Sequence, residues 1–167
     1  MTLPEACIAD IVQRATIELF SHYAVDIGPL AGTGTPTQHL ALCGVIGFTG
    51  PDMRGSLMLG CSLEPLQLAR GGGEMTMRDW LAELTNQLLG RVKNRLIGLG
   101  VDFCTSTPVV LGGERIAPVS SQSAGHLFTA DGGLVSVWFD TAIRPDLELD
   151  TADDPGAVPI EGSTLLF

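Results

Sequence analysis

Polar residues suited to holding water lie along one side of a predicted helix, residues 78–98. When each residue advances the helix by about 100°, four residues fall within roughly 60° of one another: Asp79, Glu83, Asn86 and Gly90. The asparagine amide can accept a hydrogen bond from water through its oxygen and donate one through its nitrogen, so it can orient water without removing a proton. A solvated helix face with no function is the simpler interpretation of the same pattern.

Other residue types that carry out catalysis lack the spacing that such chemistry needs. Neither a Gly-x-Ser-x-Gly nor a His-Glu-x-x-His motif occurs, and the three histidines are far apart: His22, His39 and His126. The cysteines lie separately in apolar stretches and are expected to be buried free thiols: Cys7, Cys43, Cys61 and Cys104. We therefore expect no metal site, and look for any chemistry on the helix face.

The helix over residues 78–98 also has an apolar side, formed by Leu81, Leu84, Leu88 and Val92. Burying this side against the rest of the protein leaves Glu83 and Asn86 facing solvent. Thr76 is a suitable N-cap, and Asp79 follows it at the spacing of an acid-terminated capping box. Asp79 therefore has a structural explanation that is independent of catalysis.

The rest of the chain alternates between helical and strand-like segments. Apolar residues at helical spacing predict a helix from about Pro4 to Tyr23, and residues 63–73 predict a short helix ended by glycines. A phosphate cradle at these glycines is the weaker alternative, because no strand immediately precedes them. Residues 28–38 are expected to form a loop or irregular connection. Two antiparallel hairpins are predicted, one from residues 39–48 and 55–62, the other around 130–133.

These elements predict one α/β domain of the α+β type, with a largely antiparallel sheet and long helices packed on it. A chain of 167 residues with 45% hydrophobic content is long enough for a single core. We assign residues 1–145 to this domain. Residues 146–167 are acidic and interrupted by prolines, so we expect a mobile or loosely docked C-terminal tail.

The net charge of −10 argues against nucleic acid or an anionic membrane as a partner, since both attract clustered cations. The N-terminal segment carries acids where a signal peptide needs a basic start, so we expect a soluble cytoplasmic protein. Four of the nine Lys and Arg residues nevertheless lie on or at the start of the helix over residues 78–98: Arg78, Arg91, Lys93 and Arg95. That helix is a locally basic element of an acidic protein.

The order of acid, glutamate, asparagine and distant proline resembles the signature of the CheC, FliY and CheX phosphatases. Glu83 lies four positions after Asp79 and three before Asn86, and Pro108 lies twenty-two positions after Asn86. Gly90, four positions after the asparagine, and the segment "STPVVLGG" around the proline also look like this family. The resemblance implies a CheC-like fold.

The resemblance further implies that the protein dephosphorylates a phosphorylated CheY-type response regulator, in chemotaxis or a related two-component pathway. Asn86 would orient the attacking water, and Glu83 would pair with the active-site lysine of the regulator. Asp79, Gly90 and Pro108 would support this site. No cofactor of the protein's own is implied, because Mg²⁺ would be bound by the regulator.

A second, incomplete copy of the signature narrows the resemblance to CheX. Glu18 on the first helix is followed by Ser21 at the asparagine position and by Cys43 where the distant proline would be. One intact copy in the second half resembles CheX, whose known members are homodimers, so a homodimer is expected. The alternative from another class is a noncatalytic adaptor that binds the regulator. A small-molecule enzyme has no supporting cluster of residues.

Overall fold

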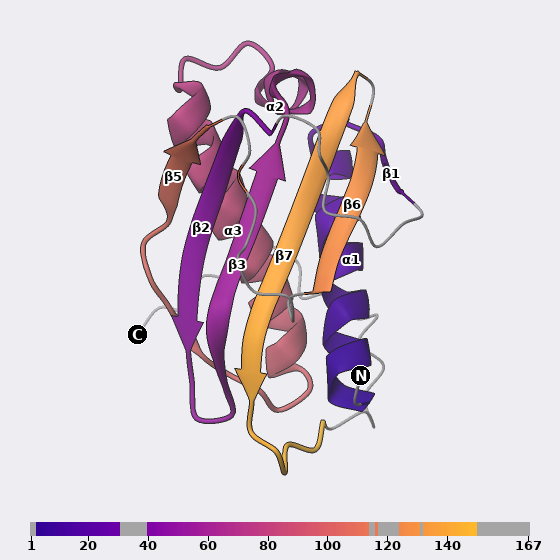
Figure 1. Ribbon diagram of the computed structural model, residues 1–167, viewed down its shortest axis with the longest axis vertical. Helices are drawn as coiled ribbons and strands as arrows, with labels where there is room; N and C mark the ends of the chain where they lie inside the picture. Colours follow the sequence, from indigo (N-terminus) through magenta and orange to yellow (C-terminus); the bar gives the residue numbers. More distant parts are fainter. Residues whose placement is uncertain (1–2, 31–39, 114–115, 117–123, 131, 150–167) are drawn as a thin grey trace.

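The computed structural model describes residues 3–30, 40–113, 116, 124–130 and 132–149. Within these residues, seven strands form one sheet in the order β1-β6-β7-β3-β2-β4, with β5 also paired to β2 (Figure 1). All paired strands are antiparallel. The strands are β1 (Ile27–Pro29), β2 (Leu42–Thr49), β3 (Met53–Cys61), β4 (Cys104–Thr105), β5 (Val109–Gly112), β6 (Ala124–Ala130) and β7 (Gly133–Ile143). The predicted α+β class with an antiparallel sheet is confirmed.

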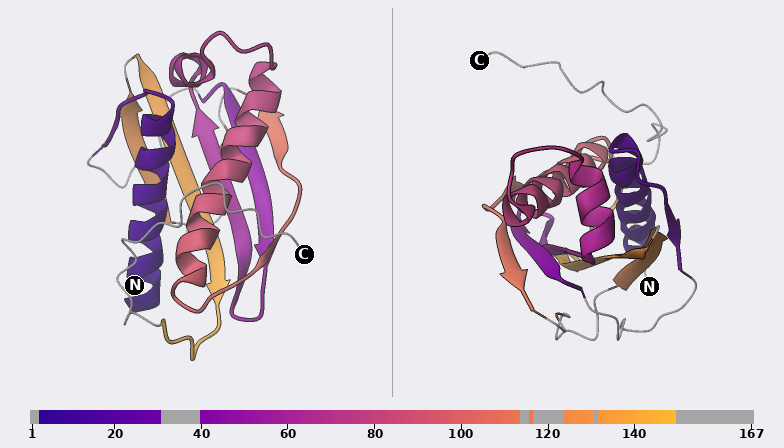
Figure 2. Two further views of the ribbon diagram at one scale, coloured as in Figure 1. Left: turned by 180° about the vertical axis from the view of Figure 1, so that it is seen from behind. Right: turned by 90° about the horizontal axis from the view of Figure 1, so that it is seen from above.

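Helices cover one face of this sheet. They are α1 (Leu3–His22), α2 (Leu63–Arg70) and α3 (Met77–Ile97). The two long helices, α1 and α3, lie side by side on the sheet, and α2 lies at one end of it (Figures 1 and 2). The predicted helices at 4–23, 63–73 and 78–98 are therefore confirmed. Gly71 ends α2 with a φ of 58°, a positive value that glycine adopts readily.

The core lies between the two long helices and the sheet face that they cover. The buried apolar residues of α3 are those of its predicted apolar side: Leu81, Leu84, Leu88 and Val92. They meet buried residues of α1 and the central strands, among them Val12, Leu19, Ile46, Leu57 and Val137. Each large apolar side chain buried in this way contributes about 1.5–3 kcal/mol relative to exposure. The core therefore fixes which side of α3 faces outward.

Thr85 of α3 packs unusually close to β2, directly over Gly44. A Cβ atom built on Gly44 would lie 2.0 Å from the Thr85 Oγ1 atom, far inside van der Waals contact. Thr85 is fully buried, and its hydroxyl donates a hydrogen bond of 2.7 Å to the Leu81 carbonyl oxygen. Because this hydroxyl is held in place, only glycine at position 44 allows α3 to approach β2 so closely.

Both predicted hairpins are present. In the first, β2 and β3 pair from Leu42 opposite Cys61 to Thr49 opposite Arg54. In the second, β6 and β7 pair up to Ala130 opposite Gly133. The hairpins place β3 and β7 next to each other at the centre of the sheet, below the long helices.

The edges of the sheet are short strands that the sequence pattern does not reveal. β1 pairs with β6 and includes Gly28 and Pro29, so the expectation of a loop over residues 28–38 is wrong for these two residues. Pro29 suits an edge strand, because its missing N–H is not needed by a further neighbour. Residues 31–38 lie outside the described part. At the other edge, β4 and β5 both pair with β2.

The chain continues along the domain beyond β7. The Arg144 guanidinium pairs with the carboxylates of Asp52 at 2.7 Å and Asp146 at 2.9 Å. Leu147 and Leu149 are partly buried against the core. The division into a domain of residues 1–145 and a tail stays a prediction, and residues 150–167 lie outside the described part.

Candidate functional site

Asp79, Glu83, Asn86 and Gly90 form a line on the outward side of α3, which we call the outer stripe. Asp79 and Asn86 are exposed, and Glu83 and Gly90 are partly exposed. The prediction that Glu83 and Asn86 face solvent is confirmed. The outer stripe lies opposite the buried leucines of α3, so the packing that orients the helix also leaves these residues on its solvent side.

The outer stripe is open to solvent at Asn86 and Gly90. Within the described part of the chain, no hydrogen bond occupies the Asn86 amide, so its oxygen and nitrogen are both available to water. A Cβ atom built on Gly90 would meet no described atom within 4 Å. Helix packing in this part of the protein therefore does not require glycine there, although glycine costs about 1 kcal/mol relative to alanine in a helix.

The N-terminus of α3 is capped as predicted. The Thr76 hydroxyl oxygen accepts a hydrogen bond of 3.2 Å from the Asp79 backbone N–H. The same hydroxyl donates at 2.7 Å to an oxygen of the Asp79 carboxylate. The acid at the start of the outer stripe thus stabilises the helix end, and its negative charge also lies favourably in the first turn.

Thr76→Ala is expected to lower the free energy of unfolding by about 1 kcal/mol, because it removes both hydrogen bonds of the cap. Thr76→Ser keeps the hydroxyl and should match the wild type. Asp79→Ala should cost less than Thr76→Ala, since the Thr76 oxygen still accepts the backbone N–H of residue 79. Chemical denaturation measures all three, and equal losses for Thr76→Ser and Thr76→Ala would contradict the capping role.

Glu83 is held by residues that the sequence reasoning missed. The Gln87 Nε2 atom donates a hydrogen bond of 2.8 Å to Glu83 Oε1. The Tyr23 hydroxyl in turn donates at 2.8 Å to Gln87 Oε1. The spacing of four residues between Glu83 and Gln87 could have indicated the first contact. The second joins positions 64 residues apart, so no local pattern reveals it.

Pro108 lies directly before β5, whose first residue, Val109, pairs with Val45 of β2. Two hydrogen bonds of 2.9 Å between Ser106 and Gly47 fix the segment just before the proline. Pro108 is therefore placed to define the entry of the chain into an edge strand. None of the described contacts joins it to Glu83 or Asn86.

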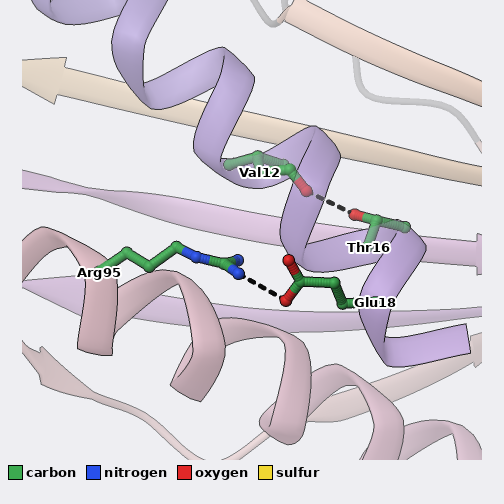
Figure 3. Close-up of polar contacts among 4 residues, drawn as sticks. All are labelled: Val12, Thr16, Glu18 and Arg95. Carbon is green, nitrogen blue, oxygen red and sulfur yellow. Dashed lines mark hydrogen bonds and ion pairs between the residues drawn. The ribbon is translucent and has the colours of Figure 1, made fainter. Parts of the chain in front are cut away.

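Two of the cationic residues on α3 form ion pairs within the protein. Arg95 forms an ion pair with Glu18 of α1 (Figure 3). Lys93 pairs with Asp102 at 3.2 Å, and this hydrogen bond holds the pKa of Asp102 below its usual value. Glu18 is the acid of the incomplete first signature. Its carboxylate is neutralised by the helix that carries the intact signature.

The other candidate residues do not assemble into a site. Cys43 and Cys61 are buried as expected, and burial raises the pKa of Cys43 to about 12, but Cys104 is exposed. Burial lowers the pKa of His126, which favours its neutral form. Among the described residues, no group of three or more His, Cys, Asp or Glu side chains is arranged to hold a metal ion. In the same residues, no helix has the length and apolar character needed to cross a membrane.

Solved structures share this arrangement of sheet and helices. CheX from Vibrio vulnificus matches with a TM-score of 0.69 and 21% identity, over 81% of this chain and 96% of that chain. A CheC-like superfamily protein from Shewanella sp. PV-4 matches with a TM-score of 0.63 and 21% identity, over 84% and 99%. The CheX–CheY–BeF3–Mg²⁺ complex from Borrelia burgdorferi matches with a TM-score of 0.56 and 18% identity, over 82% and 95%.

No protein-family model and no curated protein matches the sequence. The similarity is therefore one of architecture, at identities of about a fifth. It extends over nearly the whole length of the structures that match. The chain has the fold of the CheX and CheC-like chemotaxis proteins.

Proposed function

We propose that this protein is a CheX-like phosphatase that acts on a phosphorylated CheY-type response regulator. The observation that carries the proposal is the placement of Glu83 and Asn86 one turn apart on the open side of α3, within a CheX-like fold. The partner class is supported by the Borrelia burgdorferi neighbour, which is a complex of CheX with CheY. A response-regulator partner would place the protein in the cytoplasm.

Hydrolysis of the regulator's acyl phosphate would require this protein mainly to orient the attacking water. The acyl phosphate belongs to the regulator, which brings its own divalent metal ion and active-site lysine. Asn86 would hold a water molecule in line with the phosphorus atom, accepting one hydrogen bond from the water. Attack by this water breaks the acyl phosphate bond and releases inorganic phosphate and the free carboxylate of the regulator. Positioning of the reactants and electrostatic stabilisation account for most of the catalysis of phosphoryl transfer in general.

Glu83 would form an ion pair with the active-site lysine of the regulator and so fix the position of α3 over the phosphoryl group. An ion pair shielded from water contributes to binding and also fixes the geometry of the complex. Gly90, whose Cα faces open space, would allow a loop of the regulator to approach the helix backbone closely. One site per chain is proposed, because Ser21 and Cys43 stand where the first copy of the signature would need asparagine and proline. The acid of that copy, Glu18, pairs with Arg95.

Phosphate release from a panel of phosphorylated regulators of the same organism, with and without this protein, tests the proposal directly. Accelerated release from at least one regulator is expected. Tight binding to a regulator loaded with beryllofluoride, together with no acceleration on any regulator, would instead identify a noncatalytic adaptor. A pure adaptor has no chemical need for both Glu83 and Asn86.

We also propose that the protein is a homodimer. The outer edge of the sheet at β5 carries exposed apolar side chains, with Val109 at 59% and Leu111 at 45% exposure. An apolar edge strand of this kind favours pairing with another chain. Light scattering should give twice the monomer mass at micromolar concentration. A monomer mass at every concentration would contradict the dimer without affecting the catalytic proposal.

A further inference from the structure

Gln87 connects the glutamate of the outer stripe to the end of the neighbouring helix. Its amide nitrogen donates to Glu83 Oε1, and its amide oxygen accepts from the Tyr23 hydroxyl, both at 2.8 Å. Tyr23 directly follows α1, which runs antiparallel to α3 and is also joined to it by the ion pair between Glu18 and Arg95. The contact therefore spans two helices that the core already holds side by side.

The chemistry of the three groups allows only one direction for this chain of hydrogen bonds. An ionised carboxylate accepts hydrogen bonds and donates none, so the NH₂ end of the Gln87 amide must face Glu83. The amide oxygen then faces Tyr23, whose hydroxyl is able to donate. Every donor meets an acceptor, and a flipped Gln87 amide would place two acceptors against each other.

At the tyrosine end of this series of hydrogen bonds, the side chain is held by ring packing. Its ring lies edge-on to Trp80 of α3, with ring centroids 4.9 Å apart and an interplanar angle of 85°. Trp80 is itself buried, with 9% of its surface exposed. Aromatic pairs in this geometry add to the energy of simple burial. This packing restricts the movement of the Tyr23 ring, and so of the hydroxyl that donates to Gln87.

We infer that Gln87 and Tyr23 are positioning residues that hold the Glu83 carboxylate in one orientation for a cationic group of a partner. The inference rests on the proposed function, because the cation it invokes is the lysine of a response regulator. Glu83 Oε1 is occupied by Gln87, and Oε2 has no partner in the described part of the chain. The carboxylate thus presents one free oxygen and loses little conformational freedom on binding, which improves affinity without adding a contact.

Gln87→Leu tests this role, because leucine keeps the volume and helix propensity of the side chain and removes both hydrogen bonds. The KM for the phosphorylated regulator should rise by roughly three- to tenfold, the range expected for immobilising one flexible side chain on binding. The kcat at saturating regulator should stay within about twofold, since Asn86 is untouched. Tyr23→Phe removes only the hydroxyl and should shift KM in the same direction by less.

Gln13→Leu is the matched control. Gln13 is a partly exposed glutamine on α1 with no described hydrogen bond, so the same substitution there should leave KM unchanged. A second comparison uses the Glu83→Ala background, in which Gln87→Leu should have no further effect on KM. A general loss of helix stability would instead act equally with and without Glu83, so a full additional effect in the Glu83→Ala background would overturn the inference.

A measurement on the free protein separates this inference from the proposed function. NMR relaxation and couplings of the Glu83 side chain should show one rotamer in the wild type and averaging in Gln87→Leu and Tyr23→Phe. Averaging in the wild type would refute the positioning role, whatever the protein does. Failure of the wild type on every regulator would refute the proposed function even if the NMR result is as expected. An unchanged KM in Gln87→Leu with an active wild type would refute only the positioning role.

Discussion

Asn86→Ala is expected to lower dephosphorylation of the cognate regulator by about a hundredfold or more, while binding to the regulator survives. The loss has the size seen when a preorganised polar group is removed from a transition state. Asn86 is exposed and its amide is not used to stabilise the described structure, so its removal leaves the docking surface intact. Alanine also has a higher helix propensity than asparagine, and the fold should not weaken.

The measurement is phosphate release at saturating protein, paired with binding to a regulator loaded with beryllofluoride. Asn94→Ala is a matched control, because Asn94 is another exposed asparagine on α3, about two turns further along and beyond the C-terminal end of the outer stripe. It should retain nearly full activity. Wild-type phosphatase activity in Asn86→Ala would refute the proposed mechanism.

Glu83→Ala should weaken both docking and turnover. Removing one partner of a charge pair that is shielded from water costs at least about 2 kcal/mol, or roughly 30-fold in the Kd for the regulator. Because the contact is made before and during the reaction, kcat/KM should fall at least as much. This profile differs from that of Asn86→Ala, which should lose rate and keep affinity.

Glu83→Gln separates charge from shape in the same experiment. Glutamine fills the same space but carries no charge, so a loss close to that of Glu83→Ala would assign the effect to the ion pair. Glu74→Ala, at an exposed acid just before α3, controls for the general change in net charge. Unchanged affinity and turnover in Glu83→Ala would remove the docking role.

Much of the fold could be predicted because its elements have local periodicity. The leucines of α3 recur at helical spacing, and all of them are buried as the pattern requires. The same periodicity orients Glu83 and Asn86 outward, so the position of the outer stripe also follows from the sequence. The hairpin between β2 and β3 is predictable because its turn residues lie between two apolar runs.

The features that escaped prediction depend on contacts between distant parts of the chain. β1 and β5 are strands of three and four residues, too short to show alternation, and they exist because β6 and β2 offer them partners. The contact of Tyr23 with Gln87 arises only once α1 and α3 lie side by side. The sequence shows that α3 is locally basic, but it does not show that Lys93 and Arg95 are paired within the protein.

Under the proposed function, the ion pair between Glu18 and Arg95 bears on whether a second site could be engineered on α1. Ser21 stands where an asparagine would stand in the first signature, and both Glu18 and Ser21 are exposed residues of α1. Asparagine introduced at position 21 would join an acid that is already paired with Arg95, and Cys43 would still stand where the signature has its proline. Freeing Glu18 by removing Arg95 would also remove one of the contacts between the two long helices, leaving the shared core and the Tyr23–Gln87 hydrogen bond. The acid of the incomplete first signature thus takes part in the contact between α1 and α3.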